Sequence, residues 1–327
     1  MTPARNTELT GVFNRHLMDV MPPTITTEKD KARWAKFVEE YNATTELVVP
    51  DAPLQIDYEI NSGCNLSCQF CTQRDNKRPN ANTDQFVYRK IIRQASDMGI
   101  VSMKLNYINE PLLNPLLPEM IEYAHDHGFL NTYFATNGTL LSGRTADRLL
   151  DTRITKIMVS IDATTPLTYM RMRASGKYNV VVRNVREFIA KRNARGLKYP
   201  LVRVNFLKSP LNHHEQHAFQ KMWEGIADMI GYQSIVGKPT AVAPIGYIPR
   251  EFKCSFPFKM LVVTHDGYIL PCCTFYGRTI PIGHASTMTL EQAWKSPLMN
   301  AIRSAHLSGA YASIHACKAC INEGGQL

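Results

Sequence analysis

The feature that most constrains the fold is a regular alternation of apolar, β-branched segments with amphipathic segments between residues 54 and 237. The amphipathic stretches repeat apolar residues at helical spacing, and several end at a glycine, as in 86–99, 117–128 and 180–196. This alternation predicts an α/β fold with a parallel sheet and right-handed crossovers. Such sheets carry their functional groups at the carboxyl ends of the strands. The expected strands are LQIDYEI (54–60), SMKLNYI (102–108), NTYFATN (131–137), KIMVSID (156–162), VRVNFLK (202–208) and MIGYQSIV (229–236).

Both ends of the chain depart from this pattern. The N-terminal extension is polar, with one amphipathic helix expected at 28–42, which we expect to pack against the sheet domain or the mouth of its site. A stretch rich in Pro, Gly and Ala at 238–253 predicts a linker. Beyond it, two short strands around an Asp266-Gly267 turn give a hairpin signal, and a helix is expected at about 289–306. The predicted domains are therefore 1–50, 51–237 and 238–327.

Composition narrows the class of protein. The chain has 327 residues, 44% hydrophobic and 20% charged, which is ordinary for a globular protein. Its N-terminus lacks a signal-peptide layout and no apolar run approaches roughly 20 residues, so we expect a cytoplasmic protein without a membrane partner. Eight cysteines in a reducing compartment then indicate metal, redox or catalytic roles. The formal charge of +9 is scattered among acidic residues, so nucleic acid is not a favoured partner, and a mildly basic surface would equally suit an acidic electron carrier.

Three cysteines, Cys64, Cys68 and Cys71, follow the first expected strand. They lie in a loop of about 22 residues, and loops of that length in compact domains are usually functional. Zinc sites normally take four ligands from paired knuckles, whereas iron–sulfur clusters take thiolates from closely spaced loop cysteines. Three thiolates on a four-iron cluster leave one iron open to a substrate or cofactor. A rival hypothesis pairs Cys68 and Cys71 with Cys317 and Cys320 in one structural zinc site, but it gives Cys64 no role.

This C-x3-C-x2-C loop, with the aromatic Phe70 before its third cysteine, resembles the signature of the radical S-adenosylmethionine (SAM) superfamily. The resemblance implies a partial (β/α)6 barrel of TIM-like type, with a [4Fe-4S] cluster on Cys64, Cys68 and Cys71. In that family SAM chelates the open iron, and the reduced cluster cleaves SAM to a 5′-deoxyadenosyl radical. The resemblance also implies an electron donor such as flavodoxin or ferredoxin.

Further family-like motifs follow the later strands in the expected order. The segment Asn109-Glu110-Pro111 resembles the Gly-Gly-Glu-Pro segment that contacts the SAM ammonium, although Asn106 and Asn109 stand where glycines are commoner. A carboxylate acceptor suits that charged amine. The other residues that the resemblance assigns to SAM are Thr136 and Asn137 (the ribose segment), Ser160 at the end of the fourth strand, and Arg173, favoured over Arg171 by register, for the SAM carboxylate.

The remaining cysteines resemble those of the SPASM and twitch modules, which carry auxiliary [4Fe-4S] clusters. Cys254, Cys272, Cys317 and Cys320 fit one fully ligated auxiliary cluster, the twitch case. Consecutive residues on a strand face opposite sides, so Cys273 is left over. Its thiol is either a small buried side chain or a hydrogen-atom donor to a carbon radical, as in some sugar epimerases of this type.

The resemblance implies hydrogen abstraction from an unactivated C–H bond. We expect a radical SAM oxidoreductase or epimerase acting on a small polar substrate, carbohydrate-like or aminocyclitol-like. The alternatives are a peptide- or protein-modifying maturase of the same chemistry and a zinc-stapled nucleic-acid-binding protein. The cluster His213-His214-x2-His217 is expected on a solvated helix face, because it lacks a third ligand at a recognisable spacing.

Overall fold

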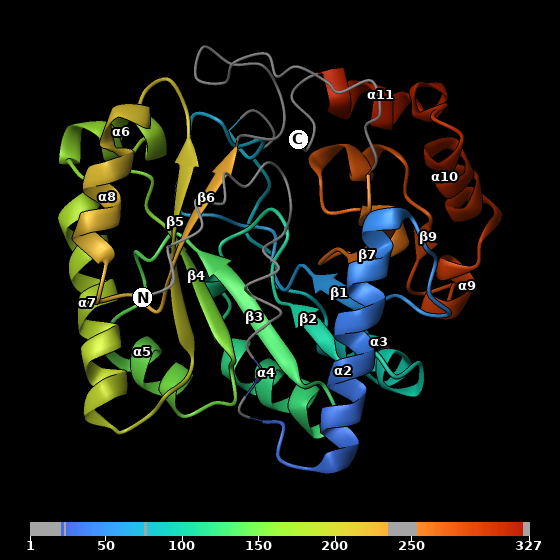
Figure 1. Ribbon diagram of the computed structural model, residues 1–327, viewed down its shortest axis with the longest axis horizontal. Coiled ribbons are helices and arrows are strands. Elements are labelled where there is room, and N and C mark those ends of the chain that lie inside the picture. Colours follow the sequence, from blue (N-terminus) through green and yellow to red (C-terminus); the bar gives the residue numbers. More distant parts are fainter. Residues whose placement is uncertain (1–20, 23, 75–76, 235–253, 323–327) are drawn as a thin grey trace, which may run out of the picture.

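The computed structural model describes residues 21–22, 24–74, 77–234 and 254–322 (Figure 1). Six parallel strands lie side by side in chain order, as expected for consecutive strand–helix units. The predicted linker at 238–253 and the first part of the N-terminal extension lie outside the described residues. The strands are β1 (Gln55–Tyr58), β2 (Ser102–Lys104), β3 (Asn131–Thr136), β4 (Lys156–Ser160), β5 (Leu201–Lys208) and β6 (Met229–Ser234).

Helices cover the outer face of this sheet, while its inner face is mostly polar, with one small apolar cluster around Tyr133 and Met158. Alternate strand residues such as Ile56, Phe134 and Ile157 join the main apolar core beneath the helices. Asp57 and Lys104 occupy paired positions of β1 and β2 on the other face, and both are largely buried. A polar inner face is what a partial barrel needs if it is to hold a polar ligand. The helices are α3 (Gln85–Asp97), α4 (Leu117–Asp126), α5 (Gly143–Leu150), α6 (Pro166–Arg173), α7 (Tyr178–Ala194) and α8 (Gln216–Trp223).

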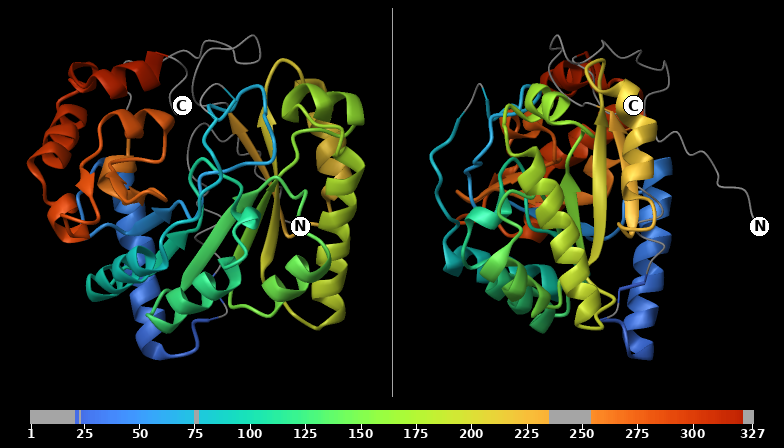
Figure 2. Two further views of the ribbon diagram at one scale, coloured as in Figure 1. Left: turned by 180° about the vertical axis from the view of Figure 1, so that it is seen from behind. Right: turned by 90° about the vertical axis from the view of Figure 1, so that its left-hand side faces the viewer.

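The N-terminal helix α2 (Glu28–Ala43) confirms the helix expected at 28–42. Its first turn is capped by the Thr27 hydroxyl, which accepts a hydrogen bond from the Asp30 N–H at 3.1 Å. It lies on the side of the sheet opposite to α4 and α5 (Figure 2). Its buried side chains Trp34, Phe37 and Tyr41 form a small core with Leu54, Val101 and Leu130. Because these three partners precede β1, β2 and β3, the helix packs at the amino ends of the strands and not at the mouth of the site.

The C-terminal module continues the same sheet. Strand β7 (Met260–Val263) pairs in parallel with β1, and β8 (Tyr268–Leu270) and β9 (Gly283–His284) follow in antiparallel order. Gly267 has φ +88°, which the hairpin turn requires, so the predicted hairpin is confirmed. Among the described residues, the result is one nine-stranded sheet that runs through both domains.

The helix expected at about 289–306 is two helices. They are α9 (Leu290–Trp294) and α10 (Pro297–Leu307). Ser296 caps α10 and Pro297 occupies its first turn, where proline is favoured but cannot continue a preceding helix. A last helix, α11 (His315–Asn322), carries the final cysteine pair. Within the described ranges, no helix combines the length and the apolar character that crossing a bilayer requires.

Candidate active site and metal centres

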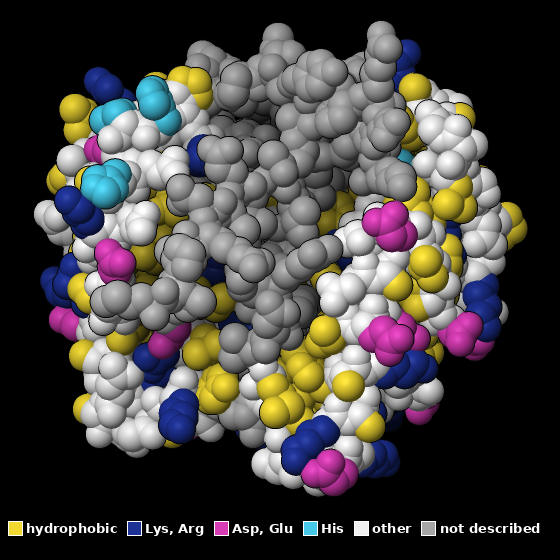
Figure 3. Space-filling view, in the orientation of Figure 1, with side chains coloured by type: hydrophobic (Ala, Val, Ile, Leu, Met, Phe, Trp, Pro, Cys, Tyr) yellow, Lys and Arg dark blue, Asp and Glu magenta, His cyan; other side chains and the backbone are white. Residues whose placement is uncertain are grey.

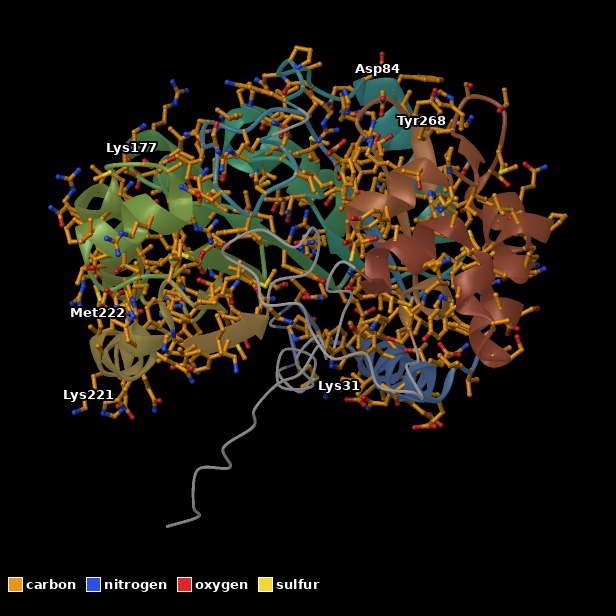
Figure 4. The ribbon with its side chains drawn as sticks, turned by 90° about the horizontal axis from the view of Figure 1, so that it is seen from above. Lys31, Asp84, Lys177, Lys221, Met222 and Tyr268 are labelled. Atoms are coloured by element: carbon orange, nitrogen blue, oxygen red, sulfur yellow. The ribbon has the colours of Figure 1, made fainter. Side chains whose placement is uncertain are left out.

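The carboxyl ends of β1 to β4 meet the C-terminal module around a cavity of about 380 Å³. The strand ends point upward in Figure 1, and Figure 4 looks down on this end of the molecule. Residues from both domains line the cavity, although they are far apart in the sequence. Among its lining residues are Cys64, Cys68, Phe70, Cys71, Asn109, Glu110, Thr136, Asn137, Ser160, Arg173 and Cys273.

The three loop cysteines are held by short local hydrogen bonds. The Cys71 N–H donates to the Cys68 carbonyl at 3.1 Å, which turns the chain between these two cysteines. Gln73 then donates from its side chain to the carbonyls of Ser62 (2.7 Å) and Ile108 (2.5 Å), tying the loop to the end of β2. Burial raises the pKa of Cys64 to about 11 and also raises that of Cys71. The residues fit a cluster, because thiols that burial keeps neutral become thiolates when a metal cation is bound.

Glu110 is a fully buried carboxylate on the wall of this cavity. It accepts hydrogen bonds from the Thr136 hydroxyl (2.6 Å), the Asn137 N–H (2.7 Å) and the Leu112 N–H (3.1 Å). Burial raises its pKa to about 7 in spite of these three donors. One carboxylate offers about four lone-pair positions, so Glu110 retains an acceptor position for a ligand. A cationic ligand group beside it would restore its ordinary ionisation.

The turn after β3 joins Glu110 to the cysteine loop. The Asn137 side-chain amide donates to Asn65 Oδ1 at 2.7 Å and approaches Cys64 Sγ at 3.9 Å. Gly138 has φ +74°, and a Cβ there would lie 2.9 Å from a methyl group of Val159. The predicted ribose segment therefore also positions the first cysteine, a role that the sequence did not reveal.

Arg173 is buried at the end of α6 and faces the cavity. It pairs with the buried Asp162, lies 5.2 Å from the Phe70 ring centroid and approaches Cys68 Sγ at 3.8 Å. Arg171, on the same helix, is exposed. The guanidinium of Arg173 is thus near both the cysteine loop and the open space of the cavity, whereas that of Arg171 is not. Asp162 was not expected from the sequence, but its place directly after β4 was a usable signal.

A second cavity, in the C-terminal module, gathers the other four predicted ligands. Cys254, Cys272, Cys317 and Cys320 line it together with apolar side chains. Cys317 and Cys320 share one face of α11 because they are three residues apart on a helix. Burial raises the pKa of Cys254, Cys317 and Cys320 to about 12 and also raises that of Cys272. Four convergent thiols in a dry cavity fit one fully ligated cluster.

Cys272 and Cys273 face different cavities. Cys272 lines the cavity of the C-terminal module, while Cys273 lines the larger cavity with Cys64 and Glu110. Thr274 and Tyr276 line both and form the wall between them. Burial raises the pKa of the Cys273 thiol strongly, and the nearby carboxylate of Asp57 raises it further. Cys273 therefore presents a neutral S–H group to the larger cavity.

A buried ion-pair network, missed in the sequence, joins the two domains beside this wall. Glu59, completely buried, accepts two hydrogen bonds from Arg78 (2.6 and 2.9 Å). His265 Nδ1 lies 3.1 Å from Glu59, and Arg278 lies 3.7 Å from it. Burial alone raises the pKa of Glu59, but hydrogen bonds from His265 and Arg78 outweigh it and hold the pKa below its usual value.

Glu59, His265 and Asp266 come close enough to resemble a metal site. Arg78 and Arg278 fill the space around Glu59 with positive charge, so the cluster is an ion-pair network. Glu59 directly follows β1, Arg78 comes from the cysteine loop, and the other members come from the C-terminal module. This separation in the sequence explains why no local motif revealed the network.

The two cysteine pairs that the zinc hypothesis joins lie in different cavities. That hypothesis is wrong, because Cys68 and Cys71 line one cavity while Cys317 and Cys320 line the other. His213, His214 and His217 are exposed at the start of α8, where Figure 3 shows histidine side chains at the surface. Their solvated position agrees with the expectation for that segment.

Comparison with known proteins identifies both domains. Residues 58–198 match the family model of the radical SAM superfamily, and residues 254–321 match SPASM, an iron–sulfur cluster-binding domain. The mycofactocin maturase MftC of Mycobacterium tuberculosis is 28% identical over 140 residues, which cover 43% of this chain and 35% of that protein. The chain thus spans about a third of that relative's length.

Two solved structures share the fold. BtrN, crystallised with AdoMet and 2-DOIA, aligns with a TM-score of 0.57 at 18% identity and covers 84% of this chain and 95% of its own. SuiB of Streptococcus suis aligns with a TM-score of 0.63 at 15% identity and covers 84% of this chain and 72% of its own. At these identities the similarity concerns the architecture of the two domains.

Proposed function

Because this chain belongs to the radical SAM superfamily and carries a C-terminal SPASM domain, we propose that it abstracts a hydrogen atom from a small polar substrate and thereby oxidises or epimerises it. The observation that carries the proposal is one cavity lined both by the predicted SAM residues of the barrel and by Cys273 of the C-terminal module. The auxiliary ligands lie behind the wall that Thr274 and Tyr276 form.

The cofactors are SAM and two [4Fe-4S] clusters, which together supply one-electron cleavage of SAM, a hydrogen-abstracting radical and an auxiliary redox centre. Cys64, Cys68 and Cys71 would hold the SAM-binding cluster, and Cys254, Cys272, Cys317 and Cys320 the auxiliary one. Glu110 would accept from the SAM ammonium through its remaining lone pair. Arg173 would donate to the SAM carboxylate, since a planar guanidinium matches a carboxylate in geometry. Phe70, Asn109, Thr136, Asn137 and Ser160 would line the rest of the SAM site.

The chain's own residues suit either outcome of hydrogen abstraction. For epimerisation, a second hydrogen-atom donor must face the substrate radical, and the neutral thiol of Cys273 faces the cavity. The donated hydrogen would then come from a group that exchanges with solvent. The S–H bond would break as the new C–H bond forms, and the thiyl radical left on Cys273 would need one electron from the one-electron donor and one proton from solvent to return to the thiol. For dehydrogenation, Cys273 would have no chemical part.

A small substrate is supported by the likeness to BtrN, whose structure contains AdoMet and 2-DOIA. The alignment with this chain covers 95% of the BtrN chain. A peptide substrate is the second candidate, supported by the name of the maturase MftC and by the structure of SuiB bound to the precursor peptide SuiA. The two candidates differ in which compounds should accelerate SAM cleavage.

The test is release of 5′-deoxyadenosine by the anaerobically reconstituted enzyme with dithionite as reductant. We expect sugars or aminocyclitols to accelerate release and peptide pools to leave it unchanged; the reverse would favour the peptide candidate. In deuterated buffer, epimerisation should place deuterium on the product carbon, and Cys273→Ala should keep SAM cleavage but lose that deuterium. Unchanged product deuteration in Cys273→Ala would remove the thiol from the mechanism.

A further inference from the structure

The helix α6 lies directly against the cysteine loop. The Gln69 N–H donates to the Met172 carbonyl at 3.4 Å, and Arg173 approaches Cys68 Sγ at 3.8 Å. Gln69, the residue after Cys68, is exposed. The outer side of α6 is therefore separated from a cluster ligand only by the width of this helix.

That outer side exposes apolar side chains next to cations. Leu167 and Met170 are 58% and 53% exposed and lie one turn apart on the helix. Arg171 and Lys177 are exposed beside them, and Lys177 lies toward the edge of the α6–α7 region in Figure 4. Two large exposed apolar side chains on one short helix, with charged neighbours, are typical of a contact surface.

The exposed charge described on this surface is positive. Residues 61–74 of the cysteine loop and residues 163–180 around α6 contain no aspartate or glutamate, although Asp75 follows Arg74 in the sequence. Glu215 accepts hydrogen bonds from Thr165 and Thr168 at the start of α6, but its side chain is buried. Arg74 is exposed on the loop side, whereas Arg173 is buried against Asp162 and does not contribute to the surface. In the described part of the chain, no ion pair neutralises Arg74, Arg171 or Lys177. A partner with an acidic face would be steered to this place.

We propose that Leu167, Met170, Arg171 and Lys177, with Arg74 of the cysteine loop, form the docking surface for an acidic one-electron carrier protein of the flavodoxin or ferredoxin class. This proposal rests on the proposed function, because it concerns the supply of the electron that SAM cleavage requires. One electron leaves the reduced flavin or iron–sulfur centre of the carrier and enters the cluster held by Cys64, Cys68 and Cys71; no proton is transferred in this step. The helix α6 lies across the barrel from the C-terminal module (Figures 1 and 2), so a carrier bound to the outer side of α6 leaves that module uncovered.

Redox partners usually associate through small interfaces whose formation depends on salt. The three cations, Arg74, Arg171 and Lys177, should therefore act mainly on the association rate, and the two apolar side chains on the lifetime of the complex. Both effects concern the carrier alone, since dithionite is a small reductant that needs no docking surface.

The experiment compares Arg171→Glu/Lys177→Glu and Met170→Asp with Lys221→Glu as a matched control. Lys221 is an equally exposed cation without an ion-pair partner in the described ranges, on the late part of α8 and distant from the cysteine loop in Figure 4. Binding of a purified flavodoxin to the cluster-loaded enzyme is measured by biolayer interferometry at low and high salt. Reduction of the cluster is followed by stopped-flow absorbance with reduced flavodoxin and, separately, with dithionite.

We expect the double variant to bind flavodoxin about tenfold more weakly at low salt, with most of the difference lost at high salt. Met170→Asp should weaken binding at both salt concentrations, and Lys221→Glu should match the wild type. Double-variant binding equal to that of Lys221→Glu would overturn the proposal, and so would a parallel fall in dithionite reduction. Failure of the wild type to cleave SAM with dithionite would instead refute the proposed function, and the binding measurement would remain interpretable.

Discussion

Replacing Glu110 by glutamine should remove a pH-dependent cost in stability. The folded pKa of Glu110 is about 7, above its ordinary value of 4.5, because the side chain is fully buried. Between these values the folded chain retains a proton that the unfolded chain has lost, so the free energy of unfolding falls as the pH rises. At about 1.4 kcal/mol per pKa unit, the loss from this one group is roughly 3 kcal/mol.

Glutamine does not titrate, and its amide nitrogen cannot accept the hydrogen bond that the Asn137 N–H donates to Glu110. The lost hydrogen bond lowers the stability of the variant by an amount that does not depend on pH. The unfolding free energy of Glu110→Gln minus that of the wild type should therefore rise by roughly 3 kcal/mol between about pH 4.5 and about pH 7.5. Groups such as Glu59 titrate in both proteins and cancel in this difference.

The assay is urea denaturation of the reduced, cluster-free, full-length chain at several pH values, with Glu119→Gln as control. Glu119 is an exposed partner of Arg148, so its replacement should change the free energy of unfolding by less than about 1 kcal/mol. If the Glu110→Gln difference stays flat with pH within about 1 kcal/mol, the reasoning from the burial of Glu110 is refuted.

Three further predictions concern the cysteines and the ion-pair network. Cys71→Ala should abolish SAM cleavage, and continued release of 5′-deoxyadenosine would contradict the assignment of the first cluster. Cys320→Ser should lower the iron content of the reconstituted chain from about eight atoms to about four while the SAM-dependent change in the electron paramagnetic resonance signal persists; loss of that signal would mean that the two sites are not independent. Glu59→Gln should lower the free energy of unfolding by about 3 kcal/mol, because it leaves the partly buried Arg78 with a weaker partner. Denaturant titration at neutral pH measures this, and a change below about 1 kcal/mol would show that solvent compensates the loss.

The sheet of the first domain could be predicted because each strand carries its own signal. Apolar segments such as 156–162 are bounded by turns and flanked by amphipathic helices, so strand order and direction follow from local rules. The pairing of β7 with β1 could not be predicted in this way. Gln55 and Met260 are partners across about 200 residues of chain, and nothing in either segment specifies the other.

The candidate site shows the same difference between local and long-range signals. Cys64, Glu110 and Arg173 belong to motifs that a short stretch of sequence can reveal. The residues that hold the site in place, such as Asn65, which accepts from Asn137, and Asp162, which pairs with Arg173, are single polar residues whose partners come from other loops. The break between α9 and α10 is a different case, because Ser296 and Pro297 do give a local signal for it.

The continuous sheet explains how one dipeptide can serve two cavities. Strand β7 is parallel to β1 and β8 is antiparallel to β7, so the chain leaves β8 along the inside of the sheet, back toward the amino ends of the barrel strands. Cys272 and Cys273 lie in the bend that follows β8, and the side chain of Cys272 lines the cavity of the C-terminal module while that of Cys273 lines the larger cavity. The two cysteines therefore cannot exchange roles unless this bend is rebuilt. Tyr107 holds the bend in place, because its hydroxyl donates to the Thr274 carbonyl at 2.5 Å. A neutral thiol within one residue of an auxiliary ligand is thus a consequence of the way in which the two domains share a sheet.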